Sequence, residues 1–169
     1  MIVLGIDPAI RTTGYGVLKS EGSAMTILDC GVIRNPAKLP HSECLRRLSG
    51  GIRELIGMYH PDAVALEDPF VGRNAGTAII LGMARGAIVA AAAEAGVPCF
   101  AYSPRSAKRA AVGSGAAPKE QVASLLAALF GLSVDNIPLD ATDAISLALC
   151  HQQMIAHGDV LAASLAKRI

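Results

Sequence analysis

Apolar runs separated by short gaps fill the first 34 residues of the chain. The first run ends at Asp7-Pro8, and two further runs with strand-like composition cover Thr12–Lys19 and Met25–Arg34. Gaps this short suit antiparallel neighbours. The pattern predicts a meander of three strands, beginning with Met1–Asp7.

From residue 41 the spacing of apolar residues becomes helical, and strands alternate with helices. The predicted helices are His41–Tyr59, Ala75–Ala95, Pro104–Ala111, Pro118–Phe130 and Asp140–His157, and the predicted strands are Ala63–Glu67 and Val97–Tyr102. This order predicts an α/β fold with a mixed five-stranded sheet and helices on both faces. We expect a single domain over residues 1–158 and a C-terminal tail, 159–169, that frays.

The helix predicted over Ala75–Ala95 is apolar almost all round, with Arg85 as its main exception before Glu94. Such a helix must be covered on every side. One side can face the sheet, and a partner subunit can cover the other. Gly82 and Gly86 have the spacing that permits close helix contact. A membrane span is the rival interpretation, but Ala and Gly are weakly hydrophobic and Arg85 lies mid-segment.

The composition excludes several classes of protein. Hydrophobic residues make up 52% of the 169 residues and charged residues 17%, which argues against disorder. Four cysteines occur without C-x-x-C spacing, so we expect buried free thiols and no structural zinc site. With no secretory signal visible, a cytoplasmic location fits best.

The net charge is only +1, but its distribution is uneven. The segment from Phe70 to Lys119 contains six Lys and Arg residues and one acidic residue, Glu94, which gives a local net charge of +5. Such a stretch can contact nucleic-acid phosphates, or it can be an ordinary solvated surface. Charge alone leaves both readings open.

Four carboxylates occupy positions that favour one shared site. Asp7 and Glu67 each end an apolar strand, and ligands of open α/β sheets gather at strand ends. Asp140 and Asp143 lie three residues apart at the start of the last helix, so they share a face. Alternation directs Asp68 to the face opposite Glu67.

Ionised carboxylates cannot crowd together without a compensating cation, and hard oxygen ligands indicate Mg²⁺ or Mn²⁺. Two such ions can stabilise the attacking and leaving oxygens of an in-line displacement at phosphorus. Simpler roles exist for the helical pair: Asp140 can be a helix cap, and Asp143 can complement the helix dipole.

Five segments resemble motifs of the RuvC family of Holliday-junction resolvases. They are the opening Gly5–Val17, a second acidic motif at Ala65–Asn74, a central helix segment at Leu81–Gly86, a basic loop at Lys108–Lys119, and a C-terminal acidic motif at Asp140–Ala144. The resemblance spans nearly the whole chain in the expected order.

The resemblance implies an RNase H-like fold, a homodimer and Mg²⁺-dependent symmetric nicking of four-way DNA junctions in recombination and repair. By motif position the metal ligands are Asp7, Glu67, Asp140 and Asp143, holding two Mg²⁺ ions per subunit with Mn²⁺ as an alternative. The expected DNA contacts are Phe70, Arg73, Asn74, Lys108 and Lys119, the last also catalytic. The RuvA and RuvB branch-migration proteins are the implied partners, and the helix over 75–95 is the expected dimer contact.

Two positions depart from the family pattern. Ala9 stands where the family has Gly, which permits positive φ and close backbone approach to a ligand, so the turn beside Asp7 could differ. Asp68-Pro69 replaces a polar and a β-branched residue, and Pro69 stiffens the entry to Phe70.

Other interpretations of the same features remain. An actin-like or sugar-kinase ATPase has a similar opening hairpin but needs two such domains, and a related single-domain nuclease or a non-catalytic junction-binding module are the alternatives. Gly113–Ala117 can let backbone amides approach a phosphate, or it can be a flexible turn. We expect packing or surface roles for His151 and His157.

Overall fold

The structure is a computed structural model that describes residues 1–68, 75–133, 135, 137–156 and 167–169. The described strands are β1 (Ile2–Asp7), β2 (Thr12–Glu21), β3 (Ala24–Arg34), β4 (Ala63–Glu67), β5 (Cys99–Tyr102) and β6 (Lys167–Arg168). The described helices are α1 (His41–Tyr59), α2 (Ala75–Glu94), α3 (Pro104–Val112), α4 (Lys119–Phe130) and α5 (Leu139–Ala156). Each predicted strand and helix is present, with ends that differ by up to two residues.

The strands form one sheet in the order β3-β2-β1-β4-β5-β6. Strand β1 pairs antiparallel with β2, and it pairs parallel with β4 up to Ile6 and Leu66. The mixed sheet is therefore confirmed. The short strand β6 lies in the predicted tail and pairs antiparallel with β5, which adds a sixth strand to the five expected.

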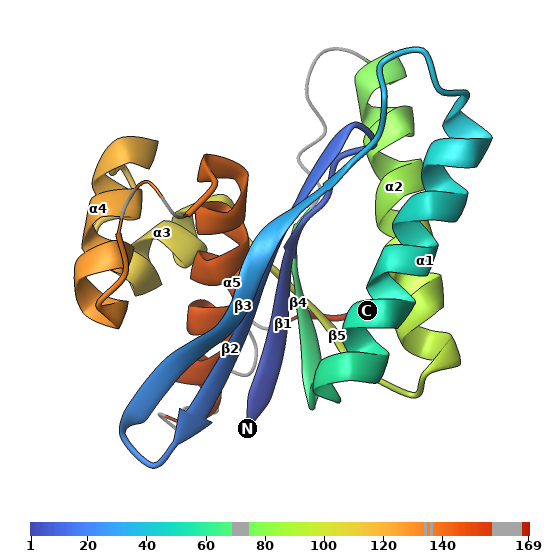
Figure 1. Ribbon diagram of the computed structural model, residues 1–169. Coiled ribbons are helices and arrows are strands. Elements are labelled where there is room, and N and C mark those ends of the chain that lie inside the picture. Colours follow the sequence, from blue (N-terminus) through green and yellow to red (C-terminus); the bar gives the residue numbers. More distant parts are fainter. Residues whose placement is uncertain (69–74, 134, 136, 157–166) are drawn as a thin grey trace.

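Helices cover both faces of the sheet, as predicted. Helices α1 and α2 lie on one face and α3, α4 and α5 on the other (Figure 1). Each face has its own hydrophobic core: Leu4 and Ile6 of β1 pack on the α1–α2 side, whereas Val3 packs on the α5 side. Strand β1 is thus buried from both directions, which explains why its sequence is apolar without alternation.

Helix α2 buries little of its apolar surface in the monomer. Its buried residues are Ala84, Ile88, Ala91 and Ala92. Among the described helices it alone is long and apolar enough to cross a membrane, with 22% of its most hydrophobic window buried. Helices of soluble proteins can be equally long and apolar, so these two features by themselves are weak evidence for a membrane span.

Helix α5 is buried through its middle and contains His151. This side chain is 2% exposed and lies against the Phe100 ring, and its Nδ1 is 2.6 Å from the Tyr102 hydroxyl. The packing role expected for His151 is confirmed, and His157 lies outside the described residues. The four cysteines are free thiols, three of them buried and Cys30 half-buried.

Candidate metal centre

Asp7 and Glu67 end neighbouring parallel strands, and both side chains belong to the α5 face of the sheet. Alternation along β1 puts Asp7 on the side of Val3, and alternation along β4 puts Glu67 on the side of Ala65. Val3 and Ala65 both belong to the core beneath α5. The expected meeting of these two carboxylates at one sheet edge follows directly from this register.

Helix α5 reaches the sheet because glycines face it. A Cβ atom at Gly5 would lie 1.9 Å from the Ala144 carbonyl oxygen, and one at Gly14 would lie 1.8 Å from that of Asp140. Gly14 pairs with Asp7 across β1 and β2. The absence of side chains at these positions therefore brings the start of α5 onto the strand that carries Asp7.

The two α5 carboxylates are placed differently. Every residue from Ala141 to Gln152 is buried except Asp143, whose side chain is 16% exposed and lines the cavity with Asp7 and Glu67. Asp140 lies one turn earlier and is absent from that lining. It acts on Asp7 through charge, raising the pKa of the Asp7 carboxyl.

The cavity has a volume of about 310 Å³ and combines three carboxylates with two lysines. Lys119, the first residue of α4, forms a 2.5 Å ion pair with Asp143. Lys108 donates from Nζ to the Ala117 carbonyl oxygen over 3.2 Å, which ties α3 to the loop before α4. Both predicted lysines thus line the same cavity as the three carboxylates.

Burial and mutual repulsion raise the pKa values of the central carboxyls. The pKa of Asp7 rises to about 7, first through burial and then through the charges of Glu67 and Asp143, while Lys119 opposes the shift. Burial and Asp143 likewise raise the pKa of Glu67. A cation placed among these groups would favour their ionised forms.

The donor set fits a hard divalent cation, because it consists of carboxylate oxygens from three different elements. Within the described residues no three His, Cys, Asp or Glu side chains are gathered into a ready-made cluster. Lys119 forms an ion pair with Asp143, and the charges of Lys119, Lys108 and Arg85 offset that of Glu67.

The turn after Asp7 accommodates Ala9 without strain. His60 is the one non-glycine residue with positive φ in the described part of the chain, so Ala9 does not need a glycine conformation. The Thr13 hydroxyl donates to the Ala9 carbonyl oxygen, and Asn35 Nδ2 donates to that of Ile10 over 2.9 Å. The departure at this position leaves Asp7 at the end of β1.

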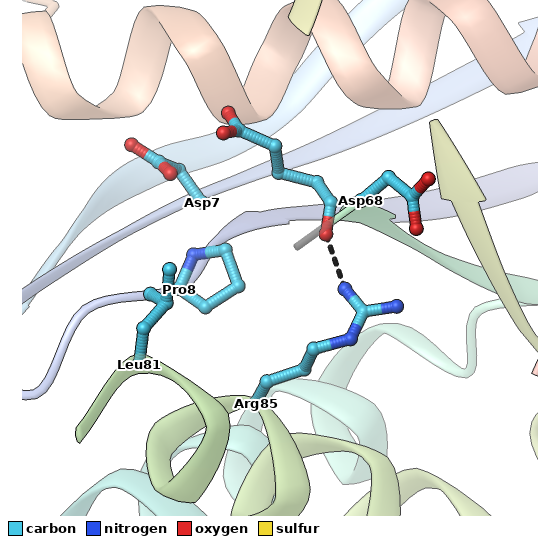
Figure 2. Close-up of a pocket in the computed structure, with 6 residues that line it drawn as sticks. Asp7, Pro8, Asp68, Leu81 and Arg85 are labelled. Carbon is cyan, nitrogen blue, oxygen red and sulfur yellow. Dashed lines mark hydrogen bonds between the residues drawn. The ribbon is translucent and has the colours of Figure 1, made fainter. Parts of the chain in front are cut away.

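Several predicted residues lie outside the site or outside the described structure. Phe70, Arg73 and Asn74, together with Pro69, fall in residues 69–74, which the structure does not describe. In Figure 2 the Asp68 side chain points away from Asp7, and both residues line the cavity that also contains Arg85. The residue that sequence reasoning missed is Arg85, which donates to the Glu67 carbonyl oxygen. Its position as a lone charge inside an apolar helix was the available signal.

Comparisons with known proteins identify the family of the chain. The family model described as crossover junction endodeoxyribonuclease RuvC matches residues 3–151. The chain is 48% identical to that enzyme of Chlorobaculum parvum over 150 residues, covering 89% of this chain and 80% of the relative. It is 42% identical to the Protochlamydia amoebophila enzyme, covering 91% and 92%.

A solved structure described as T. thermophilus RuvC in complex with Holliday junction substrate superimposes with a TM-score of 0.88. It shares 35% identity and covers 100% of this chain and 99% of its own. This structural match shows that the chain has the RNase H-like fold. The chain belongs to the RuvC family of crossover junction endodeoxyribonucleases.

Proposed function

We propose that this protein resolves four-way DNA junctions by metal-dependent hydrolysis of phosphodiester bonds, making symmetric paired nicks in recombination and repair. The observation that carries the proposal is the meeting of Asp7, Glu67 and Asp143 in one cavity, with Asp140 a turn away, in a chain of this family. The raised pKa of Asp7 supports a site built to receive a cation.

The ions we propose are two Mg²⁺ per subunit, with Mn²⁺ as an alternative, held by Asp7, Glu67, Asp140 and Asp143. Bound there, they would supply Lewis-acid stabilisation of charge on the phosphate oxygens. The carboxylates would hold the cations at the sheet edge, in the cavity that Asp7, Glu67 and Asp143 line. The domain responsible is residues 1–158, followed by the tail 159–169.

Lys119 and Lys108 provide positive charge for the phosphate on the α3–α4 side of the cavity. Lys119 is 48% exposed, so it can leave Asp143 when a cation takes the carboxylate and can then contact the scissile phosphate. Phe70, Arg73 and Asn74 are proposed DNA contacts, and Phe70 would stack on an unpaired base for roughly 1–3 kcal/mol.

The proposed homodimer uses the open face of α2. Exposed residues recur along one side of this helix: Ile79, Gly82, Met83, Gly86, Ala90 and Ala93. Ile79 is 65% exposed and Met83 40%, and among the described residues no atom beyond the adjoining helix backbone lies within 4 Å of a Cβ built at Gly82 or Gly86. A second copy covering this face would present two equal sites to a two-fold junction.

A cytoplasmic location and cooperation with RuvA and RuvB complete the proposal. The apolar α2 face is assigned to the dimer and not to a bilayer, because Arg85 lies in the middle of the helix and bonds to the end of β4.

The test is nicking and gel-shift binding of a synthetic four-way junction by Asp7→Asn, with Mg²⁺ present and absent. Nicking should fall by roughly 10³-fold or more, since several kcal/mol of charge stabilisation depend on the metal, while junction binding remains. Without metal the variant should be at least as stable as the wild type at pH 8, because a buried repelled charge is removed.

Glu54→Gln is the matched control, because Glu54 is exposed on α1 and lines neither of the two cavities beside the candidate metal centre. It should nick like the wild type. Robust nicking by Asp7→Asn would contradict the assignment of the metal centre, and nicking independent of divalent cations would contradict the mechanism.

A further inference from the structure

The Glu67 carbonyl group lies at the end of β4, just beyond the last residue pair that β4 forms with β1. The parallel pairing of β1 and β4 ends at Ile6 and Leu66. If that register continued by one residue, the Glu67 carbonyl would face the backbone nitrogen of residue 8. That residue is Pro8, whose nitrogen carries no hydrogen.

Arg85 supplies the missing donor from the other face of the sheet. Its guanidinium Nη1 donates to the Glu67 carbonyl oxygen (Figure 2). The side chain is half-buried, and the only other charged residue of α2 is Glu94 in the last position. An otherwise apolar helix therefore directs its one central charge to the backbone of a proposed metal ligand.

The contact lies beside the metal centre but apart from the lysines. A second cavity, of about 210 Å³, is lined by Asp7, Pro8, Glu67, Asp68, Leu81 and Arg85. Lys108, Lys119 and Asp143 line the first cavity, on the α5 side. Arg85 bonds to the peptide group of Glu67, and it thereby restricts the direction in which the Glu67 carboxylate leaves the strand.

We propose that Arg85 is a positioning residue that replaces the ladder hydrogen bond Pro8 cannot make and so orients Glu67 toward the cation. The inference rests on the proposed function of the same site. Because Arg85 belongs to α2, the orientation of Glu67 depends on the seating of the helix that we assign to the dimer. Partners of metal ligands commonly change metal affinity or activity by about 10–100-fold when removed.

The experiment measures Mn²⁺ binding by calorimetry in the absence of DNA, and the Mg²⁺ concentration needed for half-maximal nicking. Arg85→Leu should weaken Mn²⁺ binding by about tenfold and raise the Mg²⁺ requirement by a similar factor. At saturating Mg²⁺ its nicking rate should recover most of the wild-type value. Arg53→Leu is the matched control, because Arg53 pairs on the surface with Glu94 and lies away from Glu67.

A second substitution separates the hydrogen bond from the charge. Pro8→Ala restores a backbone N–H opposite the Glu67 carbonyl, so the double variant Pro8→Ala, Arg85→Leu should regain most of the lost Mn²⁺ affinity. The new amide at position 8 should also exchange slowly with solvent in the metal-free protein. If Arg85→Leu does not fold, Arg85→Met alone and combined with Pro8→Ala gives the same comparison, because Met also lacks the charge and the donor.

Unchanged Mn²⁺ affinity in Arg85→Leu would overturn the proposal. Rescue by Arg85→Lys without rescue by Pro8→Ala would overturn it as well, because the effect would then come from charge. A wild-type protein that binds Mn²⁺ but does not nick the junction would contradict the proposed function. The Mn²⁺ affinities of the Arg85 variants would still test the positioning role of Arg85.

Discussion

Helices α2 and α5 have similar lengths, 20 and 18 residues, and both are rich in alanine, yet the monomer buries them very differently. Helix α5 is buried continuously from Ala141 to Gln152 apart from Asp143, whereas α2 buries four residues. The more apolar helix is the more exposed one. An apolar composition thus indicates that a helix needs to be covered, but it does not indicate which part of the chain or which partner covers it.

The two helices also reach the metal centre by different means. Helix α5 approaches through glycines on β1 and β2 and inserts Asp143 directly. Helix α2 remains outside and reaches the end of β4 through one arginine side chain. Close packing makes α5 part of the monomer's core, so disturbing it should affect stability first, whereas disturbing α2 should affect assembly first.

The strongest test of this contrast is Gly14→Ala. The added Cβ would meet the Asp140 carbonyl oxygen at 1.8 Å, so α5 must move away from β2 and take Asp140 and Asp143 with it. We expect a loss of about 3 kcal/mol in the free energy of unfolding, or roughly 6–12 °C in Tm, together with reduced nicking. Thermal and denaturant unfolding measure the first effect.

Gly50→Ala on α1 is the control, since no atom lies within 4 Å of a Cβ built there. It should gain about 0.5–1 kcal/mol from the better helix propensity of alanine. Equal stabilities for the two variants would mean that α5 does not contact the sheet as closely as the structure shows.

The second prediction concerns α2, where Gly86→Glu puts a charge on the exposed apolar stripe. A charge buried in the proposed interface would be unpaired, so the dimer dissociation constant should rise by at least about 100-fold. The folded monomer should persist, because no atom lies within 4 Å of a Cβ at Gly86. Light scattering over a concentration series measures the mass.

Gly57→Glu, at an exposed and equally open position of α1, serves as the matched control and should remain dimeric. If Gly86→Glu and the control give the same dimer mass, another surface forms the dimer and the exposed face of α2 requires a different explanation.

The smallest predicted effect lies in the second half of α5. Burial lowers the pKa of His151 to about 4, below the ordinary value of 6.5. The unfolded chain binds this proton more readily, so the stability due to neutral His151 is complete above pH 6.5 and is lost as pH falls toward 4. The loss should be on the order of 1 kcal/mol, allowing for relaxation.

His151→Gln removes the titrating group, so its unfolding free energy should depend less on pH between 4 and 6.5 than that of the wild type. Urea unfolding at several pH values measures the slope. Parallel pH profiles for the two proteins would show that His151 does not titrate differently in the folded and unfolded states.

Much of the candidate metal centre could be predicted from the sequence, because strand ends and helix starts are local features. Asp7 and Glu67 each end an apolar run, and parallel strands bring such ends to one edge. Asp140 and Asp143 share the first turns of α5 for the same local reason. The wider substrate class came from the family motifs, since carboxylates alone indicate only metal-dependent hydrolysis.

Other features needed long-range contacts. The ion pair of Lys119 with Asp143 joins the starts of two helices, and no sequence spacing indicates it. The bond from Arg85 to the Glu67 carbonyl joins residues of α2 and β4, and it lies just beyond Ile6 and Leu66, where the pairing of β1 with β4 ends. The pairing of β6 with β5 likewise brings residues more than 60 positions apart together.

The sequence by itself determined the order of strands and helices, the identity of the four carboxylates and the need to cover α2, because each depends on periodicity or on neighbouring residues. The tertiary structure alone decided how closely α5 approaches β1 and β2, which lysine balances Asp143, and that Arg85 bonds to Glu67. These depend on backbone separations between distant segments, which packing of the whole chain sets.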